Sequence, residues 1–105
     1  MRRLRVSVIL FDAFSNMVLA CLLEPLRVVR DQNGLDLSWT ILTEGDRPVD
    51  SSSGITVTPD MPKADATGAD LVLIVGGDVF RDHHGASALR RSLDPLLRNA
   101  TVIAA

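Results

Sequence analysis

The chain has 105 residues, of which 47% are hydrophobic and 23% are charged, and its formal net charge is −2. A chain of this length forms one domain at most. The slightly acidic charge argues against a nucleic-acid-binding surface in this segment, because neutralising phosphates requires clustered Lys and Arg. The single cysteine, Cys21, excludes an internal disulfide and is typical of a reducing compartment. No apolar run reaches the ~18 residues of a membrane span, so we expect a soluble, cytoplasmic protein without membrane contact.

The amino-terminal segment predicts a buried strand followed by a helix. Residues 4–11 alternate and then become continuously apolar, which is typical of a strand inside a sheet. Ser15 or Asn16 can cap the next helix, because a short polar side chain accepts a hydrogen bond from the free N–H groups of the first turn. We expect this helix from residue 17 to about residue 31, and Gly34 supplies its left-handed end.

The first half of this helix, residues 17–23, is apolar on every side. A helix without a polar face packs on more than one side, and large exposed apolar patches mark interaction surfaces. We therefore expect a homodimer or a higher assembly, with this helix as the leading contact. The same apolar surroundings predict that Cys21 is a buried, inert thiol rather than a nucleophile.

After a second predicted strand at residues 36–43, the amino-acid composition of the chain changes. Residues 44–54 are rich in turn formers, and residues 55–58 are a short β-branched run. This pattern favours a small hairpin or excursion at a sheet edge over a flexible linker. Residues 64–68 are long enough for one helical turn at most.

A continuous apolar run, residues 71–75, leads directly into Gly76, Gly77 and Asp78. Such a run is typical of a strand buried on both faces, and glycines at its carboxyl end allow close approach to the backbone. The usual site-bearing edge of an open α/β sheet has this form, although a plain core strand followed by a tight turn also fits.

The last part of the chain predicts a polar loop at residues 78–85, a helix at 86–99 with a break at Pro95, and a strand at 101–105. Strands and helices thus alternate along the chain. This alternation predicts an α/β fold with three layers and a mainly parallel, flavodoxin-like sheet, whose strands lie near residues 4–11, 36–43, 71–75 and 101–105.

Four short motifs occur in a distinctive order: Phe14-Ser15-Asn16, Glu24-Pro25-Leu26-Arg27, Ser53-Gly54-Ile55 and Gly76-Gly77. With them, the chain resembles the PfpI/ThiJ superfamily, which is class I glutamine amidotransferase-like. More narrowly, it resembles the amidase-like sensor domain at the amino terminus of GlxA-type AraC-family transcriptional regulators. The resemblance implies that residues 1–105 are the amino-terminal part of such a domain, truncated before the nucleophile elbow, and that DNA is bound only through a helix-turn-helix region absent from this chain.

The resemblance also implies roles for individual residues. Glu24 corresponds to an acid that hydrogen-bonds the nucleophilic cysteine in the enzymes, and a buried carboxylate there would have a raised pKa; an exposed glutamate paired with Arg27 is the alternative. Gly77 corresponds to a backbone N–H donor of an oxyanion hole. The nucleophile would follow Ala105, and regulators of this type often lack a cysteine there. We therefore expect a chain that senses a ligand and has no catalytic activity.

We expect the ligand site above the carboxyl ends of the first and central strands, formed by Phe14, Asn16, Glu24, Gly76, Gly77 and Asp78. The glycines expose backbone donors, Asn16 offers a donor and an acceptor, and Asp78 or Glu24 could hold a cationic group. The resemblance suggests a small polar metabolite such as an amine or amino-acid derivative.

No cofactor or metal is expected. His83 and His84 are adjacent but lack two further ligands at suitable spacing, and the sequence contains neither a Walker loop nor Gly-x-Gly-x-x-Gly. Two alternatives to a regulator stay open. One is a PfpI-like cysteine hydrolase or hydratase whose nucleophile lies beyond Ala105. The other is a phosphoacceptor receiver domain, which fits poorly because Asp12 is the only acid directly after the first strand.

Overall fold

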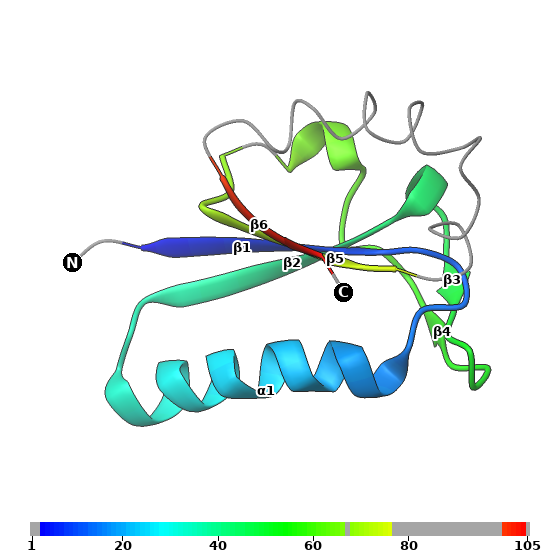
Figure 1. The fold of residues 1–105 in the computed structure, drawn as a ribbon. Coiled ribbons are helices and arrows are strands. Elements are labelled where there is room, and N and C mark those ends of the chain that lie inside the picture. Colours follow the sequence, from blue (N-terminus) through cyan, green and yellow to red (C-terminus); the bar gives the residue numbers. More distant parts are fainter. Residues whose placement is uncertain (1–2, 67, 77–99, 105) are drawn as a thin grey trace.

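The computed structural model describes residues 3–66, 68–76 and 100–104. Within these ranges, four parallel strands form one sheet in the order β2-β1-β5-β6 (Figure 1). The strands are β1 (Leu4–Leu10), β2 (Leu37–Thr43), β5 (Leu71–Val75) and β6 (Thr101–Ala104). All four predicted strands are therefore confirmed, and no two of them pair in an antiparallel way.

Helix α1 (Asn16–Asn33) covers one face of this sheet (Figure 1). It begins where the Ser15 hydroxyl accepts a hydrogen bond from Val18 N at 3.3 Å, and it ends at Gly34, whose φ is 66°. Both end signals predicted from the sequence are confirmed. They work because the cap satisfies a free N–H group and glycine adopts the left-handed conformation without a steric cost.

The side chains of β1 alternate between two apolar clusters. Val6, Val8 and Leu10 face α1, whereas Ile9 lies on the opposite face together with Phe11, which directly follows the strand. The cluster under the helix is completed by Phe14, Leu37, Val49, Leu73 and Val75, with the partly buried Val18, Leu19, Leu22, Leu23 and Leu26 of α1 packed on it. Burial on both faces explains why β1 and β5 are almost continuously apolar.

The segment between β2 and β5 forms the expected excursion. Strands β3 (Val49–Asp50) and β4 (Thr56–Val57) pair in an antiparallel hairpin, which lies beside the carboxyl ends of the parallel strands and the start of α1 (Figure 1). Two single 3₁₀ turns flank it, η1 (Glu44–Asp46) and η2 (Lys63–Asp65). The expected limit of one helical turn near residues 64–68 is confirmed.

The prediction of a buried Cys21 is wrong, because its side chain is exposed. Helix α1 contains no fully buried residue, and Met17 is 76% exposed. With 3.6 residues per turn, residues 18, 19, 22, 23 and 26 face the sheet, whereas residues 17, 21, 24 and 28 face outward. The apolar composition of the first half did not reveal which residues would face the sheet. The predicted assembly through this helix stays a prediction.

Several predicted features lie outside the described residues. They are the loop at 78–85 with His83 and His84, the helix at 86–99 that would form the third layer, and the break at Pro95. Within the described part of the chain, no helix has the length and apolar character needed to cross a membrane.

Candidate functional site at the carboxyl edge of the sheet

The loop that follows β1 is held against the tip of β5. Phe11 N donates to the carbonyl of Val75 at 3.2 Å, so the chain leaves β1 beside Gly76. A tight turn follows, in which Ala13 has a φ of 65° and Phe14 N donates to Phe11 O at 3.0 Å. The turn directs the Phe14 side chain into the core, where it is 0% exposed. The start of α1 is thereby fixed at the carboxyl edge of the sheet.

Three polar side chains, which we call the serine clasp, join this loop to the hairpin: Asn16, Ser51 and Ser53. The Asn16 amide donates to Ser51 Oγ at 3.0 Å and also to Ser53 Oγ. The two serine hydroxyls lie 3.2 Å apart, and Ser51 Oγ accepts from Ile55 N at 3.0 Å. Two motifs that carry the family resemblance, residues 14–16 and 53–55, are therefore in direct contact.

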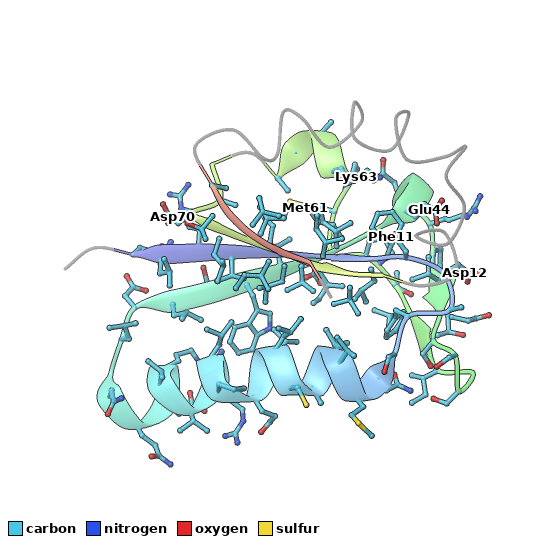
Figure 2. The ribbon with its side chains drawn as sticks, viewed as in Figure 1. Phe11, Asp12, Glu44, Met61, Lys63 and Asp70 are labelled. Carbon is cyan, nitrogen blue, oxygen red and sulfur yellow. The ribbon has the colours of Figure 1, made fainter. Side chains whose placement is uncertain are left out.

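A second set of bonds fixes the hairpin in the same place. Ala13 N donates to Asp50 O at 2.7 Å, and Asp50 N donates to Asp12 Oδ1 at 3.3 Å. Thr56 Oγ1 donates to Asp50 Oδ1 at 2.5 Å across the hairpin. Figure 2 shows Asp12 at this end of the sheet. The carboxyl edge is thus a hydrogen-bonded scaffold and not a set of independent loops.

Three of the predicted site residues lie at the carboxyl edge of the sheet. Asn16 begins α1, the half-buried Gly76 directly follows β5, and Phe14 packs in the same apolar cluster as Val75. Because Phe14 is fully buried, it supports the site and does not offer its ring to a ligand. The amide donor of Asn16 is already used by the serine clasp. Gly77 and Asp78 lie outside the described residues.

Glu24 does not point into the edge as expected. Its carboxylate is 60% exposed on α1 and pairs with Arg27, with Oε2 and Nη2 2.8 Å apart. The hydrogen bond from Arg27 and its positive charge hold the pKa of Glu24 below the ordinary value of 4.5, so the raised pKa of a buried acid is not found. The arrangement is the alternative that the sequence left open, an exposed glutamate paired with its helix neighbour.

Sequence reasoning missed the link between the two 3₁₀ turns. The Lys63 ammonium donates to Thr43 O at 3.0 Å and lies 3.2 Å from Asp46 Oδ1, and the backbone and side-chain bonds from Lys63 lower the pKa of Asp46. Figure 2 shows Lys63 and Glu44 on the face away from α1. The sequence did not reveal this link, because Asp46 and Lys63 are 17 residues apart in a turn-rich segment. No group of three or more metal-ligating side chains occurs among the residues described.

The chain is similar to known transcriptional regulators in sequence and in fold. No protein-family model matches the chain. The HTH-type transcriptional regulator GbdR of Pseudomonas aeruginosa is 33% identical over 84 residues, which cover 74% of this chain and 23% of the regulator. An AraC family transcriptional regulator from Pseudomonas putida superposes with a TM-score of 0.71 at 20% identity, covering 96% of this chain and 55% of that one.

A THiJ/PfpI family protein from Pseudomonas syringae also superposes, with a TM-score of 0.67 at 13% identity, covering 99% of this chain and 42% of that one. The predicted fold class is therefore confirmed: the chain has the flavodoxin-like α/β fold of the ThiJ/PfpI superfamily. The predicted resemblance to AraC-family regulators is confirmed as well. The chain spans only about a quarter of the length of the curated regulator.

Proposed function

We propose that this chain, which shares the ThiJ/PfpI fold, is the amino-terminal part of the ligand-sensing and dimerising domain of a cytoplasmic AraC-family transcriptional regulator. The observation that carries the proposal is the 33% identity with GbdR over 84 residues, in a chain that also superposes on an AraC family regulator. DNA would be bound by a helix-turn-helix region outside this chain, because the net charge of −2 argues against a nucleic-acid-binding surface in this segment.

The ligand would bind at the carboxyl edge of the sheet, beside Gly76. The serine clasp supports this placement, because it fixes the loop after β1 without using the backbone at the tip of β5. Glycine at a strand tip lets a small polar molecule reach backbone donors. Gly77 and Asp78 continue this tip and belong to the proposed site. Glu24 does not, because its carboxylate is paired on the outer side of α1.

The described residues support sensing over turnover. A nucleophilic cysteine works when its thiolate lies beside an activating group at the site of reaction. Cys21 instead lies on the exposed outer side of α1, and the acid three residues later on that helix, Glu24, is bonded to Arg27. Neither side chain belongs to the cluster at the strand tips. We therefore propose that this part of the protein binds its ligand without transforming it.

The outer side of α1 is the proposed dimer contact. Met17 and Val28 are 76% and 36% exposed there, with Cys21 exposed between them. If two copies pair through this surface, a short bismaleimide should join Cys21 to its counterpart in the intact protein, and Met17→Glu should abolish the product. Equal cross-linking in the Met17→Glu variant would place the contact elsewhere.

A PfpI-like cysteine hydrolase or hydratase is the second candidate, and the superposition on a THiJ/PfpI family protein favours it. Incubating the intact protein with glyoxal, amide and ester substrates separates the two candidates. The regulator proposal predicts no turnover above buffer, whereas turnover that survives Cys21→Ser would indicate a nucleophile elsewhere in the polypeptide and an enzyme.

The direct test of the regulator proposal uses the intact protein. Genomic DNA fragments retained by the purified protein would be sequenced, and a metabolite panel would be screened by thermal shift. We expect a defined promoter fragment, together with a metabolite that both stabilises the protein and changes its affinity for that fragment. Failure to retain any fragment over a non-specific competitor would contradict the proposal.

A further inference from the structure

A polar hollow lies on the face of the sheet opposite α1, over the amino-terminal halves of β1 and β2. Its volume is about 130 Å³. Arg5 and Ser7 of β1 form its floor with Ser38 and Thr40 of β2, because Arg5 is the register partner of Ser38 and Ser7 that of Thr40. Its wall consists of Met61, Asp65, Ala66 and Ala69. Figure 2 shows Met61 above this face.

This floor departs from the pattern of the rest of the sheet. Further along the same strands and on the same face, Ile9, Phe11 and Leu42 are buried and apolar. Parallel strands are normally apolar on both faces, because other layers cover them. Four adjacent polar residues at the opposite end of the face therefore need a separate explanation.

The hydroxyl groups of the floor have no protein partner among the described residues. Ser7 is only 4% exposed, and no hydrogen bond joins the side chains of Ser7, Ser38 or Thr40 to another residue in the described ranges. No fully buried side-chain oxygen of these ranges lacks a hydrogen-bond partner, so the Ser7 hydroxyl is reached by solvent from the hollow, where it can bond to water or to a ligand. The hydroxyls thus open into the hollow with their donor and acceptor capacity unused.

Arg5 adds a positive charge to these hydroxyls. Its backbone N–H is bonded to Asp70, but its guanidinium forms no ion pair with any described residue. The guanidinium lies beside Gly68, since a Cβ built on that glycine would be 3.5 Å from Arg5 Nη1. Arg5 lines the hollow, and its guanidinium lies beside the glycine that precedes Ala69 of the wall.

We propose that this hollow binds a small oxyanion, the carboxylate or phosphate group of a metabolite. A guanidinium is suited to such groups because it presents parallel N–H donors, and the three hydroxyls supply further donors. The volume fits an anion of a few heavy atoms. The site is separate from the carboxyl edge and does not depend on the protein being a regulator.

Among the described residues of the wall, Asp65 is the group that opposes an anion. It is an exposed acid at the rim, so its charge is screened by solvent and repels a bound anion only weakly. Removing the acid should tighten the binding of an anion, whereas a site for a cation or a zwitterion would be weakened by the same change.

The test is calorimetric titration of the intact protein with sodium acetate and with inorganic phosphate, at low and at high ionic strength. We expect saturable binding of at least one anion, weakened by added salt. Arg5→Gln should reduce the affinity about tenfold and Ser7→Ala about fivefold, because each removes a donor to a charged group. Asp65→Asn should raise it about twofold. Arg3→Gln is the matched control, because Arg3 pairs with Asp36 outside the hollow.

Each alternative outcome has a clear meaning. Absence of saturable heat with both anions would show that the hollow holds only water and would overturn the proposal. Binding that Arg5→Gln leaves unchanged would place the anion elsewhere, and weaker binding in Asp65→Asn would rule out an anion site. Comparing the affinity for acetate with the affinity for phosphate identifies whether the hollow prefers a carboxylate or a phosphate group. Circular dichroism and thermal unfolding of each variant confirm that losses are not due to misfolding.

Discussion

The two ends of the parallel sheet use polar side chains in opposite ways. At the carboxyl edge, Asn16, Ser51 and Ser53 are bonded to one another and to the backbone of the hairpin. At the amino-terminal half, Ser7 and Thr40 lie side by side, and their side-chain hydroxyls have no hydrogen-bond partner among the described residues. Bonded polar groups hold a scaffold in place, whereas unbonded ones are available to a ligand or to water. The contrast predicts that removing a hydroxyl group lowers the free energy of unfolding at the carboxyl edge and changes it little at the opposite end.

The largest expected effect comes from the apolar residue beneath the carboxyl edge. Phe14→Ala should lower the free energy of unfolding by about 3–5 kcal/mol, because Phe14 is fully buried and its loss leaves a cavity. Urea denaturation measures the change. Ser52→Ala, at an exposed side chain of the hairpin, is the control and should change stability by less than about 0.5 kcal/mol. Equal effects of the two substitutions would mean that the described packing of this loop is wrong.

The serine clasp should give the next largest effect. Ser51→Ala removes the acceptor for Asn16 and for Ile55 N at a site that is 5% exposed, so we expect a loss of about 1–3 kcal/mol. Ser52→Ala is the matched control, because the neighbouring serine is exposed and should be nearly neutral. A neutral Ser51→Ala would show that the clasp does not stabilise the edge.

The helix cap is expected to contribute less. Ser15→Ala should cost about 1 kcal/mol, because Val18 N loses the bond to the Ser15 hydroxyl. Ser15→Asp should retain most of the stability, since a carboxylate also caps and favours the positive end of the helix dipole. A loss of similar size in both variants would indicate that another feature of Ser15 matters.

At the opposite end of the sheet, Ser7→Ala should be close to neutral. The Ser7 hydroxyl bonds to no residue that the structure describes, so the change in free energy of unfolding should stay within about 0.5 kcal/mol although Ser7 is 4% exposed. Thermal unfolding of Ser7→Ala and of Ser51→Ala, measured in parallel, compares the two losses of stability. A loss of stability in Ser7→Ala as large as that in Ser51→Ala would contradict the proposed difference between the two ends of the sheet.

The smallest effect concerns the exposed pair on α1. The pKa of Glu24 lies below its ordinary value, so the pair stabilises the fold above the unfolded pKa and loses this contribution as pH falls through the folded pKa. An NMR titration of the Glu24 carboxyl should show the lowered pKa, and Arg27→Gln should return it towards 4.5. Arg30→Gln, which removes a partner of Asp31, should leave it unchanged.

Much of the fold could be predicted because its signals are local. The apolar run in β1, the cap at Ser15 and the left-handed Gly34 each depend on a few neighbouring residues. The site was harder, because its bonds join distant positions: Asn16 and Ser51 are 35 residues apart. Cys21 was placed inward because residues 17–23 of the helix are apolar on every side, and composition alone could not show which side faces the sheet. Glu24 was placed inward because of the family resemblance.

The central claim is that the carboxyl edge beside Gly76 binds the effector of a transcriptional regulator. The most direct measurement is fluorescence anisotropy of the retained promoter fragment with the intact protein, with and without effector, for wild type, Gly76→Val and Ser52→Ala. The account predicts that Gly76→Val binds the fragment with unchanged affinity but no longer responds to the effector, whereas Ser52→Ala behaves as wild type. A full response in Gly76→Val would contradict the claim.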